Sequence, residues 1–259
     1  MDYGQAQEAN ALQSGLFDMG DGHGSSAQEP PLVNVVPWGV KERLTAEKTA
    51  LGFYLSGHMF DEVEREVRQF VKLKIDDAME SREARSFAGI VGELRIINGQ
   101  RGKLAIFKLD DKSGTIEATA DEALLNASRN VLKDDELVIV QGVVQNDRFS
   151  GGLRLKVSQI FDLPTARAKY GKFLRVAVNG KAPDIARMVK DFPAKREQTE
   201  QGDLIRGLAV RLSVSRQHEH CAATAEVLLG DSAKFFPSDA ALASWMAQAH
   251  LGQSQIVYD

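Results

Sequence analysis

Apolar and polar positions alternate along five short runs between residues 87 and 163, with the period of two that is typical of β-strands. The runs cover residues 87–96, 103–111, 115–119, 137–146 and 153–163. Residues 121–132 instead show a helical pattern, opened by acidic residues that suit a helix N-terminus. Three strands, one helix and two strands are the element order of the OB-fold, a five-stranded, partly open barrel. The pattern therefore predicts such a barrel over residues 86–163.

The segments around the barrel have other patterns. Residues 1–36 are rich in Gly, Ser and Pro, which predicts a flexible tether, and residues 37–85 show helical spacing. Residues 164–259 predict strand, helix, strand, strand, helix, strand, the order of a ferredoxin-like split βαβ domain. In this interpretation 195–203 is a charged loop and 204–215 one continuous strand. The fold class is accordingly mixed α+β, with a helical hairpin, a barrel and a small C-terminal domain.

Composition limits the classes of function. The formal net charge of −4 argues against a basic coat over the whole protein, so a nucleic-acid site must be a local patch. The single cysteine, Cys221, excludes an internal disulfide. No stretch of the sequence has the length and apolarity of a membrane span, and the first residues do not resemble a secretory signal. We therefore expect a cytoplasmic protein with no membrane partner.

Charge placement within the predicted barrel points to single-stranded nucleic acid. Residues 86–162 hold ten basic and eleven acidic residues, but the cations gather at the first and last hairpins while the acids flank the helix. OB-folds bind oligonucleotides at these loops and on the second and third strands, where cations neutralise phosphates and aromatic rings stack on bases. The predicted nucleic-acid-binding residues are Arg95, Arg101, Lys103, Lys108, Arg148, Phe149, Arg154 and Lys156. Phe107 is expected in the core, with base stacking as the alternative.

Three stretches carry a family resemblance: LTAEKTALGFYLSGHMFDE, RGKLAIFKLDDKSGTIE and NDRFSGGLRL. They resemble the C-terminal third of the bacterial replicative DNA polymerase III alpha subunit, and the likeness runs from QSGLFD at Gln13 to the terminal VYD. The resemblance implies that the barrel contacts single-stranded template and that the C-terminal domain docks the tau subunit of the clamp loader, among other holoenzyme subunits.

The same resemblance implies that Gln13, Leu16 and Phe17 form a sliding-clamp-binding peptide. A short apolar anchor on a polar tether suits a linear peptide that fills a preformed pocket. The alternative is that Leu16 and Phe17 pack on the adjacent helices.

No catalytic residue, metal site or cofactor is expected in this chain. The acid pairs Asp76-Asp77, Asp110-Asp111 and Asp134-Asp135 fall in predicted solvated turns, and the run from His218 to Cys221 lacks metal-site spacing. The resemblance implies that the parent is a DNA-directed DNA polymerase, a nucleotidyltransferase that uses Mg, and that this chain is a fragment beginning at an internal methionine.

Three other functions stay open from the residues alone. The chain could be a stand-alone OB protein that binds single strands, a tRNA-binding OB module attached to a synthetase remnant, or an adaptor whose barrel binds protein.

Overall fold

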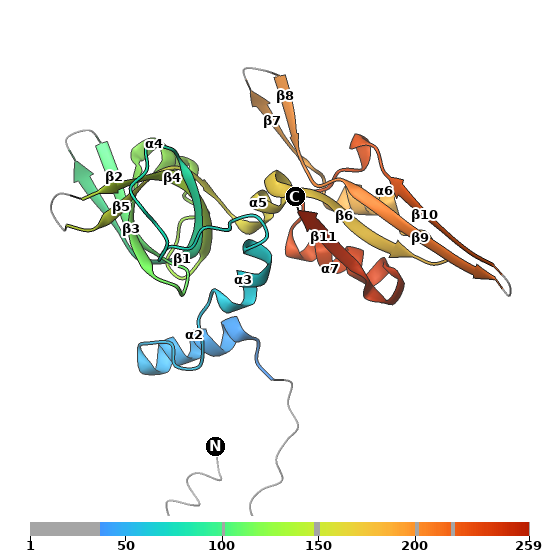
Figure 1. Ribbon diagram of the computed structural model, residues 1–259, viewed down its shortest axis with the longest axis horizontal. Coiled ribbons are helices and arrows are strands. Elements are labelled where there is room, and N and C mark those ends of the chain that lie inside the picture. The colour runs from blue at the N-terminus through green and yellow to red at the C-terminus, as the bar shows by residue number, and fades with distance from the viewer. Residues whose placement is uncertain (1–36, 100–101, 148–150, 200–201, 219–220, 259) are drawn as a thin grey trace, which may run out of the picture. The chain divides into compact units, whose positions relative to one another are not determined.

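A computed structural model describes residues 37–99, 102–147, 151–199, 202–218 and 221–258 (Figure 1). The predicted clamp peptide, Gln13, Leu16 and Phe17, lies outside these residues, as do Arg101, Arg148 and Phe149. From Gly39 onward the chain forms one unit with three apolar clusters.

The predicted five-stranded barrel is confirmed. Its strands are β1 (Arg85–Gly99), β2 (Gly102–Asp110), β3 (Thr115–Asp121), β4 (Leu137–Asn146) and β5 (Leu153–Phe161). They close in the order β1-β2-β3-β5-β4, with antiparallel neighbours except for the parallel pair β3–β5. The short helix α4 (Glu122–Ala127) follows β3 and lies at one end of the barrel (Figure 1). Asp121 caps it by accepting a hydrogen bond from the Leu124 N–H at 2.9 Å.

Alternate residues of each barrel strand fill the interior. On β2 these are Ala105, Phe107 and Leu109, and Phe107 is only 1% exposed. Phe107 is therefore a core residue. Close packing also explains Gly142 on β4: a Cβ there would lie 2.3 Å from the Lys156 carbonyl oxygen. Any larger residue at position 142 would have to push β4 and β5 apart.

Two helices cover one flank of the barrel. They are α2 (Val40–Leu51) and α3 (Asp61–Val67), as the helical pattern predicted. Their buried side chains, among them Leu44 and Val67, pack with residues on the outer side of β1 and β4, such as Ile90 and Ile139. This packing covers the outside of β1 and β4 near their pairing.

The C-terminal domain contains a four-stranded sheet and two α-helices that pack against it. The strands are β6 (Gly171–Val178), β9 (Val210–His218), β10 (Cys221–Leu228) and β11 (Ser254–Tyr258), and the helices are α6 (Ile185–Asp191) and α7 (Asp239–Gln248). Helix α5 (Leu163–Tyr170) connects this domain to the barrel, and 3-10 turns cover Asp231–Ala233 and His250–Gly252. Trp245 of α7 and Met188 of α6 pack against the sheet in one core.

The strand order corrects the predicted split βαβ arrangement. The sheet runs β10-β9-β6-β11, and β6 and β9 are direct parallel neighbours, so no strand separates them. The predicted charged loop is also wrong, because β7 (Lys195–Thr199) and β8 (Gly202–Arg206) form a separate antiparallel hairpin. The expected single strand over 204–215 is broken at Leu208, whose N–H donates to the Phe235 carbonyl at 2.8 Å. The strand order and the break at Leu208 both depend on pairing between residues distant in sequence.

Candidate nucleic-acid interface

Four of the predicted cations lie on one outer face of the barrel. Pairing places Lys108 of β2 opposite Glu117 of β3, and Glu117 opposite Arg154 of β5. In the next row Arg95 of β1 pairs with Ile106, Ile106 with Thr119, and Thr119 with Lys156 of β5. On β2, β3 and β5 the neighbours of opposite parity are buried, so Lys108, Glu117, Arg154 and Lys156 face outward, and the pairing with Ile106 places Arg95 on the same face. We call Arg95, Lys108, Arg154 and Lys156, with Glu117 among them, the cationic face.

Ion pairs tie most of the cationic face together. Arg154 Nη2 lies 2.5 Å from Glu117 Oε1 and 3.0 Å from Asp147 Oδ2. Arg95 Nη2 lies 4.0 Å from the other Glu117 oxygen, and Lys108 Nζ lies 2.6 Å from Glu93. Lys156 is exposed and makes no ion pair with any residue that the structure describes. The face therefore combines four cations with three nearby carboxylates.

The β1–β2 hairpin extends this face. Lys103 lies exposed near its tip, and its backbone N–H donates to Glu122 Oε2 at 3.2 Å. Ile96 and Ile97 are 56% and 45% exposed. The pairing register of β1 shifts between Gly92 and Arg95, so the strand beyond this point no longer follows the earlier alternation. Ile97, which is on the same side of β1 as Arg95, therefore adds exposed apolar surface beside a cation.

One predicted solvated acid is instead buried. Asp111 is 1% exposed and accepts hydrogen bonds from Arg68 Nη2 at 2.6 Å and from the Ile75 N–H at 3.0 Å. Burial alone would raise the pKa of Asp111, but these donors and the Ser113 hydroxyl hold it below its usual value. The carboxylate anchors the segment after α3 to the β2–β3 turn, so the solvated interpretation was wrong here.

Asp135 has a similar anchoring role at the other predicted acid pair. It accepts a hydrogen bond from the Tyr54 hydroxyl at 2.7 Å and pairs with Lys48 of α2. Burial alone would raise its pKa, but hydrogen bonds from Lys48 and Tyr54 hold it below the usual value. Asp76 and Asp77 are exposed, as expected. Among the described residues, no three metal-ligating side chains converge.

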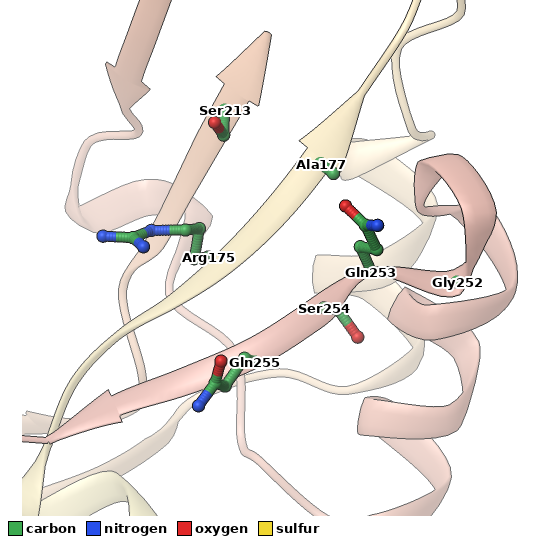
Figure 2. A pocket seen from close by; sticks show the side chains of 7 residues that line it. All are labelled: Arg175, Ala177, Ser213, Gly252, Gln253, Ser254 and Gln255. Carbon is green, nitrogen blue, oxygen red and sulfur yellow. The ribbon is translucent and has the colours of Figure 1, made fainter. Parts of the chain in front are cut away.

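A shallow hollow of about 340 Å³ lies on the C-terminal sheet (Figure 2). Arg175 of β6, Ser213 of β9 and Gln255 of β11 are among its lining residues. The described lining includes no His, Cys, Asp or Glu, so the hollow has no general acid or base of these types.

A buried arginine joins the helical segment to the C-terminal domain. Arg167 of α5 donates to both carboxylate oxygens of Glu66 in α3, at 2.7 and 2.8 Å, and to Asp239 at the start of α7, at 2.5 Å. The Tyr258 hydroxyl of β11 donates to Glu66 at 2.6 Å. Four elements distant in sequence therefore meet at one charged cluster.

Comparisons with known proteins agree with this architecture. Residues 86–163 match a family model described as an OB-fold nucleic acid binding domain. A DNA polymerase III subunit alpha from Neisseria meningitidis serogroup B is 38% identical over 181 residues, which are 69% of this chain and 15% of that protein. The corresponding subunit from Pseudomonas aeruginosa is 36% identical over 177 residues, 67% of this chain and 15% of that protein.

A solution structure of the second OB-fold domain of replication protein A from Methanococcus maripaludis aligns over 35% of this chain and 93% of that chain. Its identity is 21% and its TM-score is 0.28. The chain spans about 15% of the length of the curated relatives just described. None of the described helices is long and apolar enough to cross a membrane.

Proposed function

From the chain's homology to the C-terminal OB-fold region of DNA polymerase III alpha subunits, we propose that its barrel holds single-stranded template DNA during replication. The observation that carries the proposal is the cationic face. Its four cations come from β1, β2 and β5 and lie in two adjacent rows on the outside of the barrel. OB-folds bind oligonucleotides on the surface that includes the second and third strands.

The chemistry of the face favours backbone contact over base reading. Lysine and arginine neutralise phosphates without regard to sequence, while the exposed Ile97, on the same side of β1 as Arg95, offers apolar contact. Carboxylates on the same face reduce its net positive charge. We therefore expect modest affinity, strong salt dependence and little sequence preference.

A triple variant tests this proposal: Arg95→Gln, Lys108→Gln and Lys156→Gln. These side chains are exposed, so their loss leaves the core intact. Affinity for a fluorescent oligothymidine is measured by anisotropy over a range of salt concentrations. Each lost phosphate contact lowers the slope of log K against log salt by about 0.7, so the triple variant loses about 2 in slope.

The matched control removes the same three charges from the C-terminal domain, by Lys181→Gln, Arg187→Gln and Lys190→Gln. All three side chains are exposed. Equal loss of affinity in both variants would mean that only net charge matters and would refute the cationic face. A folded RNA hairpin as competitor separates single-strand binding from the tRNA-binding alternative, which predicts stronger competition by the RNA.

The clamp and tau contacts are proposals that rest on the sequence resemblance. We propose that Gln13, Leu16 and Phe17 bind the sliding clamp and that the C-terminal domain binds tau. Leu16→Ala combined with Phe17→Ala should abolish clamp binding in surface plasmon resonance and leave tau binding unchanged. If the double variant retains both interactions, the peptide assignment is refuted. The polymerase activity, its Mg and a cytoplasmic location are proposed for the parent protein, and no residue of this chain is assigned to catalysis.

A further inference from the structure

A carboxylate lies at the centre of the cationic face. Glu117 is on β3, the middle strand of the outer surface, and its direct neighbours across the strands are Lys108 and Arg154. Arg95 approaches it from β1 at 4.0 Å. Three of the four cations of the face therefore surround one acid.

Glu117 satisfies the same donors that a phosphate would use. A carboxylate and a phosphate both accept charge-assisted hydrogen bonds from the guanidinium group. Arg154 contacts Glu117 and Asp147 through one nitrogen, Nη2, instead of the two-nitrogen fork of a bidentate pair. Glu117 Oε1 makes no hydrogen bond with any described residue, so this ion pair lacks the two parallel hydrogen bonds of a bidentate pair and is easier to exchange.

Exposure also favours exchange. The side chains of Glu117 and Arg154 are 31% and 36% exposed, so an incoming phosphate can reach their exposed atoms, although Glu117 Oε1 and Arg154 Nε are themselves buried. A partly exposed ion pair contributes little to folding stability. Structural stability alone therefore gives a weak reason for an acid at this position, between cations on three strands.

We propose that Glu117 is an internal competitor of the DNA phosphate: its carboxylate occupies Arg154 and Arg95 until the strand displaces it. The inference rests on the proposed single-strand binding of the barrel. Each phosphate contact to Arg154 then requires the loss of an existing ion pair, which lowers affinity. Lower affinity for each phosphate suits a surface along which a template strand must move, because each contact has to be released as the strand advances.

The test is Glu117→Gln, which removes the charge and preserves the size of the side chain. Binding to oligothymidine at low salt should become tighter by roughly three- to tenfold, and the salt slope should steepen by about 0.7, one additional phosphate contact. Glu117→Thr is a second variant that also removes the charge. Threonine favours β-strands, and it already occupies positions 115 and 119, two residues before and after Glu117. Far-UV circular dichroism verifies that both variants fold.

The matched control is Glu136→Gln, which changes net charge equally but removes an exposed partner of Lys41 in α2. Affinity should change much less there than in Glu117→Gln. Unchanged affinity in the folded Glu117 variants would show that phosphates bypass Arg154, and weaker affinity would show that Glu117 positions the arginines. Either result overturns the inference while salt-dependent binding by the wild-type chain still supports the proposed function. Absence of that binding would instead refute the proposed function itself.

Discussion

Arg167→Ala should destabilise the protein more than removal of any exposed charge. Arg167 is 5% exposed and donates two hydrogen bonds to Glu66 and one to Asp239. Its loss leaves the Glu66 carboxylate with the Tyr258 hydroxyl as its remaining hydrogen-bond partner among the described residues. Breaking a buried ion pair by removing one partner costs about 3–5 kcal/mol.

Partial exposure reduces this figure. The Glu66 side chain is 26% exposed, so water can solvate part of the charge that Arg167 leaves behind. We therefore expect a loss of about 2–4 kcal/mol in the free energy of unfolding. Urea unfolding followed by circular dichroism and tryptophan fluorescence measures it, since Trp245 is fully buried in the C-terminal core.

The control is Arg187→Ala. Arg187 pairs with Asp191 at 3.4 Å on α6, and its side chain is 74% exposed, so its loss should cost less than about 1 kcal/mol. An Arg167→Ala variant as stable as this control would refute the reasoning. A double-mutant cycle with Glu66→Gln should return a coupling energy between the two side chains; additive effects would contradict the assigned pair.

This ion pair also predicts a pH dependence. Burial alone would raise the pKa of Glu66, but hydrogen bonds from Arg167 and Tyr258 hold it below its ordinary value. A carboxyl whose pKa is lowered on folding stabilises the protein above its unfolded pKa, and this stabilisation is lost as pH falls through the lowered value. The stability difference between wild type and Arg167→Ala should therefore shrink on acidification. A constant difference would argue against an ionised Glu66 as the partner.

Three further predictions concern the barrel. Gly142→Ala should cost at least about 2 kcal/mol in urea unfolding, because its Cβ would meet the Lys156 carbonyl, whereas Gly92→Ala, with open space around its Cβ, should cost far less; equal costs would contradict the packing argument. Phe107→Leu should lower stability by about 1 kcal/mol and leave oligothymidine affinity unchanged, since the ring is in the core; lost affinity at full stability would instead indicate base stacking. Asp111→Asn should destabilise the protein at neutral pH, with the penalty relative to wild type shrinking in acid as the wild-type carboxyl, whose pKa is lowered, becomes protonated; a penalty that grows on acidification would refute this linkage.

Local alternation along the chain was sufficient to predict the elements and the class of the barrel. Alternation along each strand reflects a side-chain period of two, which is a local property of the backbone. It therefore identified the outward set Arg154 and Lys156 and the inward set Leu155 and Val157, and the element order indicated an OB-fold. The resemblance in LGFYLSGH and FSGGL pointed to the same family as the later comparisons.

Tertiary pairing decided which of these side chains meet. Arg95 and Arg154 are 59 positions apart, and only the register of four strands brings both to Glu117. The burial of Asp111 likewise depends on Arg68 arriving from another segment. In the C-terminal domain, the same element order fits either a split or a direct βαβ arrangement, and the β6–β9 pairing selected the direct one. Local patterns record which way a residue faces along its own strand; its partners depend on long-range register, which such patterns do not encode.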